Sequence, residues 1–261
     1  MEPLDPILIA SAVRRSGTTL VQRLMCSSEN ALVFGESCAH ELGFAQQLFQ
    51  GKQLSLMPFK ESNDVMLKDV LAGKVDDWLA NLMPPVPSYL DAVMESAFGP
   101  MVYLKKYAKE AGRPLWGMKM AQWSAYQLIQ LQRLFPDLKL IYIHRDLESC
   151  VSSAIRMEMI YELHEIEHFC QLWKGDAQVV QDQFPSENVL WIDYNQLVEE
   201  PEVVVDALQG FTGAKNIDVA VMEKKINTFS YDPRLQKDAE GSWLKPVSVS
   251  EEIKNIIRKY A

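Results

Sequence analysis

The sequence predicts an α/β fold: a parallel β-sheet flanked by helices, with a helical cap inserted after the first strand-helix unit. Short apolar runs rich in Ile, Leu and Val recur along the chain, which is typical of strands buried on both faces. Helical stretches of about 10 residues or more separate these runs, as expected for crossovers between parallel strands. Because no repeat or Gly/Ser linker divides the 261 residues, we expect a single domain over residues 1–261.

Four runs are the expected strands. In chain order they are PILIASAV (6–13), LWGMKMA (115–121), LKLIYIH (138–144) and NVLWIDY (188–194). The segment 37–113, rich in Met, Phe and Leu and interrupted by three closely spaced prolines, is the expected cap. Ligands of such sheets bind beyond the carboxyl ends of the strands. We therefore expect one rim, covered by the cap, to carry the polar residues that end the strands: Arg14 to Thr19, Lys119, Arg145 and Tyr194.

The loop after the first strand reads RRSGTTLVQRLM (14–25) and runs into a predicted helix. Such a loop presents unpaired N–H groups and the positive end of the helix dipole, which suit phosphate or sulfate. Gly17 lets the backbone approach the anion, and Ser16, Thr18 and Thr19 add hydroxyl donors. Thr18 stands where a Walker A loop has its lysine, and Arg14 and Arg15 supply positive charge instead. We therefore expect a P-loop-like sheet that binds an oxyanion.

This loop resembles the 5′-phosphosulfate loop of sulfotransferases that use 3′-phosphoadenosine 5′-phosphosulfate (PAPS). It is closest to the branch that includes the protein-tyrosine sulfotransferases, whose loop reads P-R-S-G-T-T-L; Arg14 replaces the usual Pro. The family holds the 3′-phosphate with an Arg at a strand end and a Ser eight residues later, which Arg145 and Ser153 match. WIDYNQLVEEPE (191–202) and GSWLKPVSVSEEI (241–253) also resemble family segments.

The resemblance also implies catalytic residues. The branch has a general base in a G-E pair 21 residues after the loop arginine, where this chain has Glu36, and a lysine at a later strand end, here Lys119. Glu36, Lys119 and Arg15 would catalyse in-line transfer of a sulfuryl group from PAPS to an acceptor hydroxyl, less readily an amine, releasing 3′,5′-bisphosphoadenosine (PAP) without a metal. The implied cofactor-binding residues are Arg14, Arg15, Ser16, Gly17, Thr18, Thr19, Arg145 and Ser153.

Three other interpretations stay open. A P-loop nucleotide kinase or hydrolase would use Mg²⁺ and a phosphate-bridging lysine. A non-catalytic protein on the same fold would bind PAP without transferring sulfate. The motif HEIEH, with His164, Glu165 and His168, satisfies the H-E-x-x-H zinc pattern, but it is better explained as the polar side of a helix whose buried stripe runs from Ile155 to Trp173.

Composition limits the partners. The net charge of −9 and the pI near 5.0 argue against binding nucleic acid or an anionic membrane. The N-terminus shows no targeting segment and the chain no membrane span, so we expect a cytoplasmic protein. Its four scattered cysteines are expected to be reduced core residues. The acceptor is expected to be a small molecule or a peptide, with a small metabolite preferred.

Overall fold

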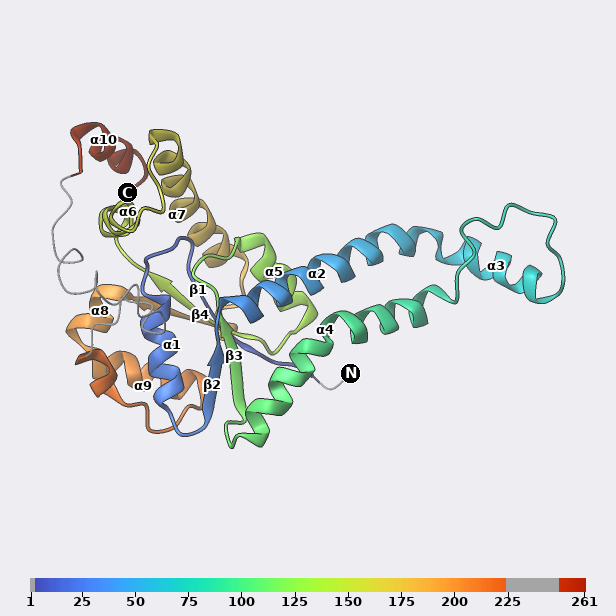
Figure 1. Cartoon of the computed structure of the whole chain (residues 1–261), viewed down its shortest axis with the longest axis horizontal. Coiled ribbons are helices and arrows are strands. Elements are labelled where there is room, and N and C mark those ends of the chain that lie inside the picture. Colours follow the sequence, from blue (N-terminus) through green and yellow to red (C-terminus); the bar gives the residue numbers. More distant parts are fainter. Residues whose placement is uncertain (1–2, 224–248) are drawn as a thin grey trace, which may run out of the picture.

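A computed structural model, which describes residues 3–223 and 249–261, has a five-stranded parallel sheet with helices on both faces (Figure 1). The strands are β1 (Ile7–Ala10), β2 (Ala31–Phe34), β3 (Leu115–Lys119), β4 (Lys139–His144) and β5 (Val189–Asp193), in the order β2-β3-β1-β4-β5. The predicted α/β class is confirmed. β2 was not among the four expected strands, because its four residues ALVF are too short a run to stand out from the flanking helices.

Ten α-helices connect and cover these strands in the described part of the chain. They are α1 (Thr18–Ser27), α2 (Glu36–Leu56), α3 (Lys60–Leu71), α4 (Val86–Glu110), α5 (Ala125–Leu134), α6 (Leu147–Arg156), α7 (Leu163–Gln183), α8 (Tyr194–Glu199), α9 (Pro201–Thr212) and α10 (Glu251–Tyr260). None of the described helices is long and apolar enough to cross a membrane.

The sheet separates two apolar cores. Along β1, Leu8 and Ala10 point into the core formed with α2, α4 to α7 and α10, whereas Ile7 and Ile9 point into the core formed with α1, α8 and α9. This alternation follows from the two-residue period of a strand. Because both faces are buried, β1 reads as a continuous apolar run. Gly117 of β3 lies opposite Ile7, and a Cβ there would stand 2.0 Å from the Ile7 carbonyl oxygen, so the close strand approach requires glycine.

The segment predicted to be helical, 37–113, forms α2, α3 and α4, which we call the helical arm (residues 36–110). Its base packs on the body through Phe98, which contacts Phe135 edge to face at a centroid distance of 5.2 Å and Phe49 at 6.5 Å. Beyond this base, α2 and α4 run side by side away from the sheet, with α3 at the far end (Figure 1). Most of the arm therefore projects outward, and the start of α2 is the part that borders the rim.

One expected helix is in fact two. The predicted buried stripe from Ile155 to Trp173 is interrupted because α6 ends at Arg156, Glu158 adopts a left-handed φ of 54°, and α7 begins only at Leu163. Glu162 and Glu165 form a capping box there, with the Glu165 carboxylate accepting from the Tyr161 and Glu162 N–H groups. Glu165 of the HEIEH motif thus caps a helix, and the described residues contain no cluster of three or more His, Cys, Asp or Glu able to hold a metal.

Candidate active site

The carboxyl ends of the strands bring distant segments to one rim. In the sheet register, Ile9 of β1 pairs with Lys119, the last residue of β3, and Ala10 pairs with Tyr142 of β4. The loop 11–17, the first turn of α2, the residues after β3 and β4, and the start of α8 therefore all lie at this edge. The rim predicted from the sequence has this composition, and the structure adds Glu36 to it.

The loop between β1 and α1 is open toward an anion. Gly17, which precedes α1, has a left-handed φ of 104°, and its carbonyl accepts from the N–H groups of Leu20 and Val21. The backbone N–H groups of Ser16 to Thr19 donate to no acceptor among the described residues, nor do the Thr18 and Thr19 hydroxyls. Four N–H groups at a helix N-terminus form a ready binding site for phosphate or sulfate.

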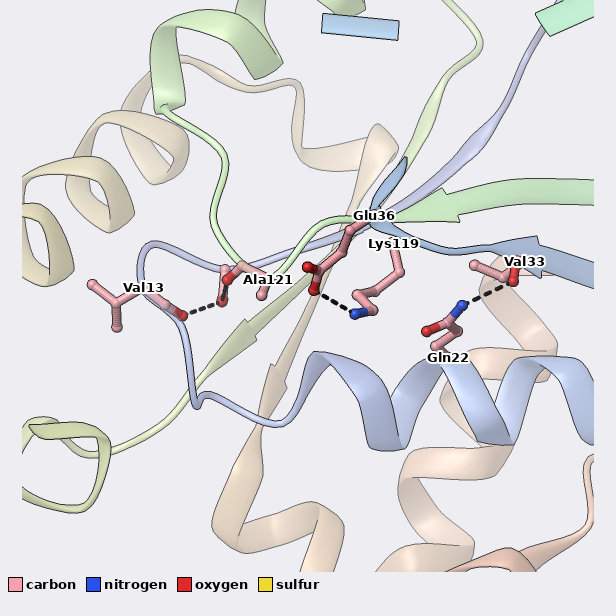
Figure 2. A network of polar contacts seen from close by, with 7 residues as sticks. Val13, Gln22, Val33, Glu36, Lys119 and Ala121 are labelled. Carbon is pink, nitrogen blue, oxygen red and sulfur yellow. Dashed lines mark hydrogen bonds and ion pairs between the residues drawn. The ribbon is translucent and has the colours of Figure 1, made fainter. Parts of the chain in front are cut away.

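Two buried serines hold this loop in shape. The Ser11 hydroxyl lies 2.6 Å from the Val13 carbonyl oxygen and 2.8 Å from that of Ala121, and its single proton serves one of them at a time. The Ser16 hydroxyl donates to the Val13 carbonyl at 2.9 Å. The side chain of Ser16 is thus engaged within the loop. The contact to Ala121 ties the loop to the segment that follows β3 (Figure 2).

Two arginines and a serine meet on the α6 side of the loop. The Arg15 Nε donates to the Ser153 Oγ at 3.0 Å, and the Arg145 guanidinium donates to the Arg15 carbonyl at 3.0 Å. Burial and next the positive charge of Arg145 lower the pKa of the Arg15 guanidinium, with Arg156 adding to the effect. The buried Arg145 Nε has no hydrogen-bond partner in the described part of the chain. Arg15 also holds a left-handed φ of 71°. Crowded cations, an orphaned donor and backbone strain together indicate a site for an anion.

Aromatic residues position this cluster. The Arg145 guanidinium lies over the Tyr194 ring, 4.2 Å from its centroid, and the Trp173 indole N–H donates to the Arg145 carbonyl at 2.8 Å. The Tyr194 ring also packs on Gly17, where a Cβ would stand 2.5 Å from the ring. Beneath the loop, Cys150 lies 3.7 Å from the Ser16 hydroxyl, and burial raises the pKa of its thiol to about 11, so it is a protonated packing residue at neutral pH.

Glu36 and Lys119 form an ion pair at the other side of the loop, with 2.6 Å between the carboxylate Oε1 and the ammonium Nζ. Figure 2 shows the two side chains pointing toward one another from the start of α2 and the end of β3. The Lys119 side chain is 8% exposed, whereas that of Glu36 is 47% exposed. Nearby, the Gln22 amide donates to the Val33 carbonyl at 3.0 Å and holds α1 against β2. A buried ammonium thus faces a carboxylate that remains open to an incoming group.

A pocket of about 360 Å³ opens beside this pair. It is lined by Arg14, Glu36, His40, Met120, Ala121, Gln122, Ser124 and Gln127. A larger hollow of about 470 Å³ lies along α3 on the arm, but it is distant from the rim and contains neither the free loop N–H groups nor the paired carboxylate. Because the smaller pocket contains Glu36, it is the candidate acceptor site.

The fold and this rim define an α/β protein whose loop at a helix N-terminus is suited to phosphate or sulfate groups. The model of the sulfotransferase family matches residues 6–218, so the chain belongs to the sulfotransferase family. The match extends across all five strands and the helical arm. No curated protein matches the chain.

Solved structures share the fold. The sulfotransferase domain of the Synechococcus PCC 7002 olefin synthase superposes with a TM-score of 0.52 at 17% identity, covering 98% of this chain and 94% of that one. The sulfotransferase domain from the curacin biosynthetic pathway gives 0.51 at 16%, covering 97% and 96%. Retinol dehydratase, solved with androsterone and the inactive cofactor PAP, gives 0.50 at 14%, covering 100% and 80%.

The structure brings together most of the predicted site residues, in two groups. Arg15, Arg145 and Ser153 form one group on the α6 side, and Glu36 with Lys119 forms the other. Arg14 lines the pocket beside Glu36, whereas the sequence analysis assigned it to the cofactor together with Arg15. The contacts of Trp173 and Tyr194 were not foreseen, since an aromatic residue in a predicted helix or strand end carries no sequence signal for packing on a binding loop. Trp243 and the segment 241–248 lie outside the described residues.

Proposed function

We propose that this chain transfers a sulfuryl group from PAPS to an acceptor hydroxyl, less readily to an amine, and releases PAP. The observation that carries the proposal is the contact at 2.6 Å between Glu36 and Lys119, 83 residues apart, beside a loop with free N–H groups. A carboxylate, an ammonium and an anion-binding loop are the parts that sulfuryl transfer needs. We further propose that the chain is nearest to the branch that includes the protein-tyrosine sulfotransferases, because its candidate base is Glu36.

The residues of the rim fit the two anionic groups of PAPS, its 5′-phosphosulfate and its 3′-phosphate. The loop N–H groups of Ser16 to Thr19 would hold its 5′-phosphosulfate, and Arg15, Arg145 and Ser153 would hold its 3′-phosphate, filling the cationic cluster that now includes an orphaned Arg145 donor. When bound, PAPS supplies an activated sulfuryl group and a phosphate leaving group. No contact in this arrangement calls for a metal.

Glu36 would act as general base by taking the proton of the acceptor hydroxyl. Lys119 engages only the Oε1 oxygen of this carboxylate, and the half-exposed side chain leaves the second oxygen able to accept the proton. Lys119, buried at the strand end, would place its charge where negative charge develops on the transferring group. The ion pair therefore holds both catalytic groups beside the pocket.

A thermal-shift titration tests the ligand. PAP without Mg²⁺ is compared with ATP and Mg²⁺, because a ligand bound only by the folded state raises the melting temperature with concentration. We expect PAP to raise the melting temperature and ATP with Mg²⁺ to leave it unchanged. Stabilisation by ATP and Mg²⁺ without any PAP shift would instead favour a kinase or hydrolase, and PAP binding without sulfated product from any acceptor would favour a non-catalytic binding protein.

Two variants test the assigned roles. Glu36→Gln should keep PAP affinity and lose turnover by about 100-fold or more, since a general base contributes about 10²–10⁴-fold. Glu41→Gln, an exposed acid of the same helix, is its control. Arg145→Ala should lower the affinity for PAP by about 10-fold or more. Arg133→Ala, at the end of α5 and so near the opposite edge of the sheet, should not. Full turnover of Glu36→Gln would refute the base assignment.

A further inference from the structure

Arg14 and Arg15 are adjacent in sequence but serve different parts of the rim. Arg15 donates to Ser153 of α6 and lies among the cations that would hold the cofactor. Arg14 instead lines the pocket formed with Glu36 and His40 of α2 and with the residues after β3. The left-handed φ of 71° at Arg15 redirects the chain at this point. The pair thus places one guanidinium on the cofactor side and the other on the acceptor side.

The pocket contains donors that nothing within the described residues satisfies. The exposed Arg14 guanidinium makes no hydrogen bond or ion pair there, and the Gln122 amide makes no hydrogen bond. Gln127, whose amide oxygen accepts from the Ser124 hydroxyl at 3.2 Å, also lines the pocket. These side chains come from three segments and converge on the space beside Glu36.

The charges of the pocket do not cancel. Glu36 and Lys119 neutralise one another in their ion pair, which leaves the Arg14 guanidinium without a charged partner among the described residues, in a protein whose net charge is −9. A single planar guanidinium with amide donors around it matches a carboxylate, which it can bind through two parallel hydrogen bonds. A doubly charged phosphate matches less well, because one cation would face two negative charges close to the Glu36 carboxylate.

We propose that the pocket selects acceptors that carry a carboxylate, so that the substrates are small hydroxy acids anchored by Arg14. This inference rests on the proposed function, since it assigns Glu36 to the reacting hydroxyl and Arg14 to the distal carboxylate. The volume of about 360 Å³ suits a small molecule. Arg14 is then a specificity-determining residue of the acceptor, not a ligand of the cofactor.

The test measures binding of matched acid and ester probes by calorimetry, with and without saturating PAP. The probes are 4-hydroxyphenylacetate and 3-hydroxydecanoate, each beside its methyl ester. The wild type should bind at least one acid about 10-fold or more tightly than its ester, as expected for hydrogen bonds between charged partners. Arg14→Gln should bring the acid-to-ester ratio close to one while PAP affinity stays at the wild-type value. Arg14→Lys should keep part of the preference, and Arg133→Gln should keep all of it.

The outcomes separate this inference from the proposed function. Equal binding of acid and ester by the wild type, or binding of neither acid, overturns the carboxylate assignment even if PAP binds and sulfated products form. A loss of PAP affinity in Arg14→Gln with an unchanged acid-to-ester ratio returns Arg14 to the cofactor site and also overturns the inference. Absence of PAP binding by the wild type refutes the proposed function instead, and the titrations without PAP still decide whether Arg14 recognises a carboxylate.

Discussion

The rim of the sheet and the helical arm differ in the burial of their side chains and in the sequence separation of their contacts. At the rim, several polar side chains meet partners that are distant in sequence: the Lys119 side chain, 8% exposed, pairs with Glu36 across 83 residues, and Arg15 donates to Ser153 across 138 residues. On the arm, large apolar side chains face solvent, with Trp78 81% and Leu71 80% exposed. The rim is built by tertiary contacts and the arm by local helix formation. Substitutions should therefore lower the free energy of unfolding more at the rim and the sheet than on most of the arm.

The largest effect is expected where the arm joins the body of the protein. Phe98→Ala removes a fully buried ring that packs against Phe135 and Phe49, and should lower the free energy of unfolding by about 3–5 kcal/mol. Phe59→Ala, on the exposed part of the arm, should change it by about 0.5 kcal/mol or less. Denaturant unfolding followed by circular dichroism compares the two. Similar losses in both variants would show that the outer arm is packed as tightly as its base.

The sheet itself should tolerate no added methyl group at Gly117. Alanine there would bring a Cβ to 2.0 Å from the Ile7 backbone oxygen, and a backbone atom cannot move aside as a side chain can. We expect a loss of about 3 kcal/mol in the free energy of unfolding, at the upper end of overpacking effects. Thermal unfolding of Gly117→Ala measures it, and a wild-type melting temperature would contradict the close approach of β1 and β3.

Gly17→Ala tests the loop of the rim. Its φ of 104° disfavours any side chain, and the added Cβ would lie 2.5 Å from the Tyr194 ring, which can shift only by leaving Arg145. We expect about 1–3 kcal/mol of destabilisation together with weakened PAP binding. Gly35→Ala is the matched control, since its Cβ would meet nothing within 4 Å and its φ is −84°. Retained PAP affinity in Gly17→Ala would mean that Tyr194 does not shape the binding loop.

A glycine-to-alanine substitution on the arm should raise the free energy of unfolding, whereas at Gly117 and Gly17 it should lower it. Gly51 lies within α2, where an added Cβ meets nothing within 4 Å. Because alanine is the better helix former by about 0.8–1 kcal/mol, Gly51→Ala should stabilise the protein by up to that amount. Its unfolding midpoint, measured beside that of Gly117→Ala, sharpens the contrast between arm and sheet. A destabilised Gly51→Ala would reveal packing against α2 that the structure does not contain.

Much of the architecture was predictable because it depends on local patterns. Continuous apolar runs marked four of the five strands, and the same local reading predicts an anion site at the Gly17 loop. Two errors have local causes. The apolar run ALVF at β2 is too short to give a signal, whereas β1 lies in the longer run PILIASAV. The break between α6 and α7 depends on a left-handed Glu158 and a capping box, which a helical apolar period conceals.

Local sequence patterns are enough to predict the parallel α/β sheet, the helical character of the arm and the residue types gathered at the rim. How those residues group depends on the three-dimensional structure: Lys119 pairs with Glu36, Arg15 donates to Ser153, and Arg14 lines the pocket beside Glu36. The physical reason is that strand periodicity and helix-capping preferences act between neighbours in the chain, whereas the partner of a rim side chain depends on strand order and register, which bring residues 83 and 138 positions apart into contact.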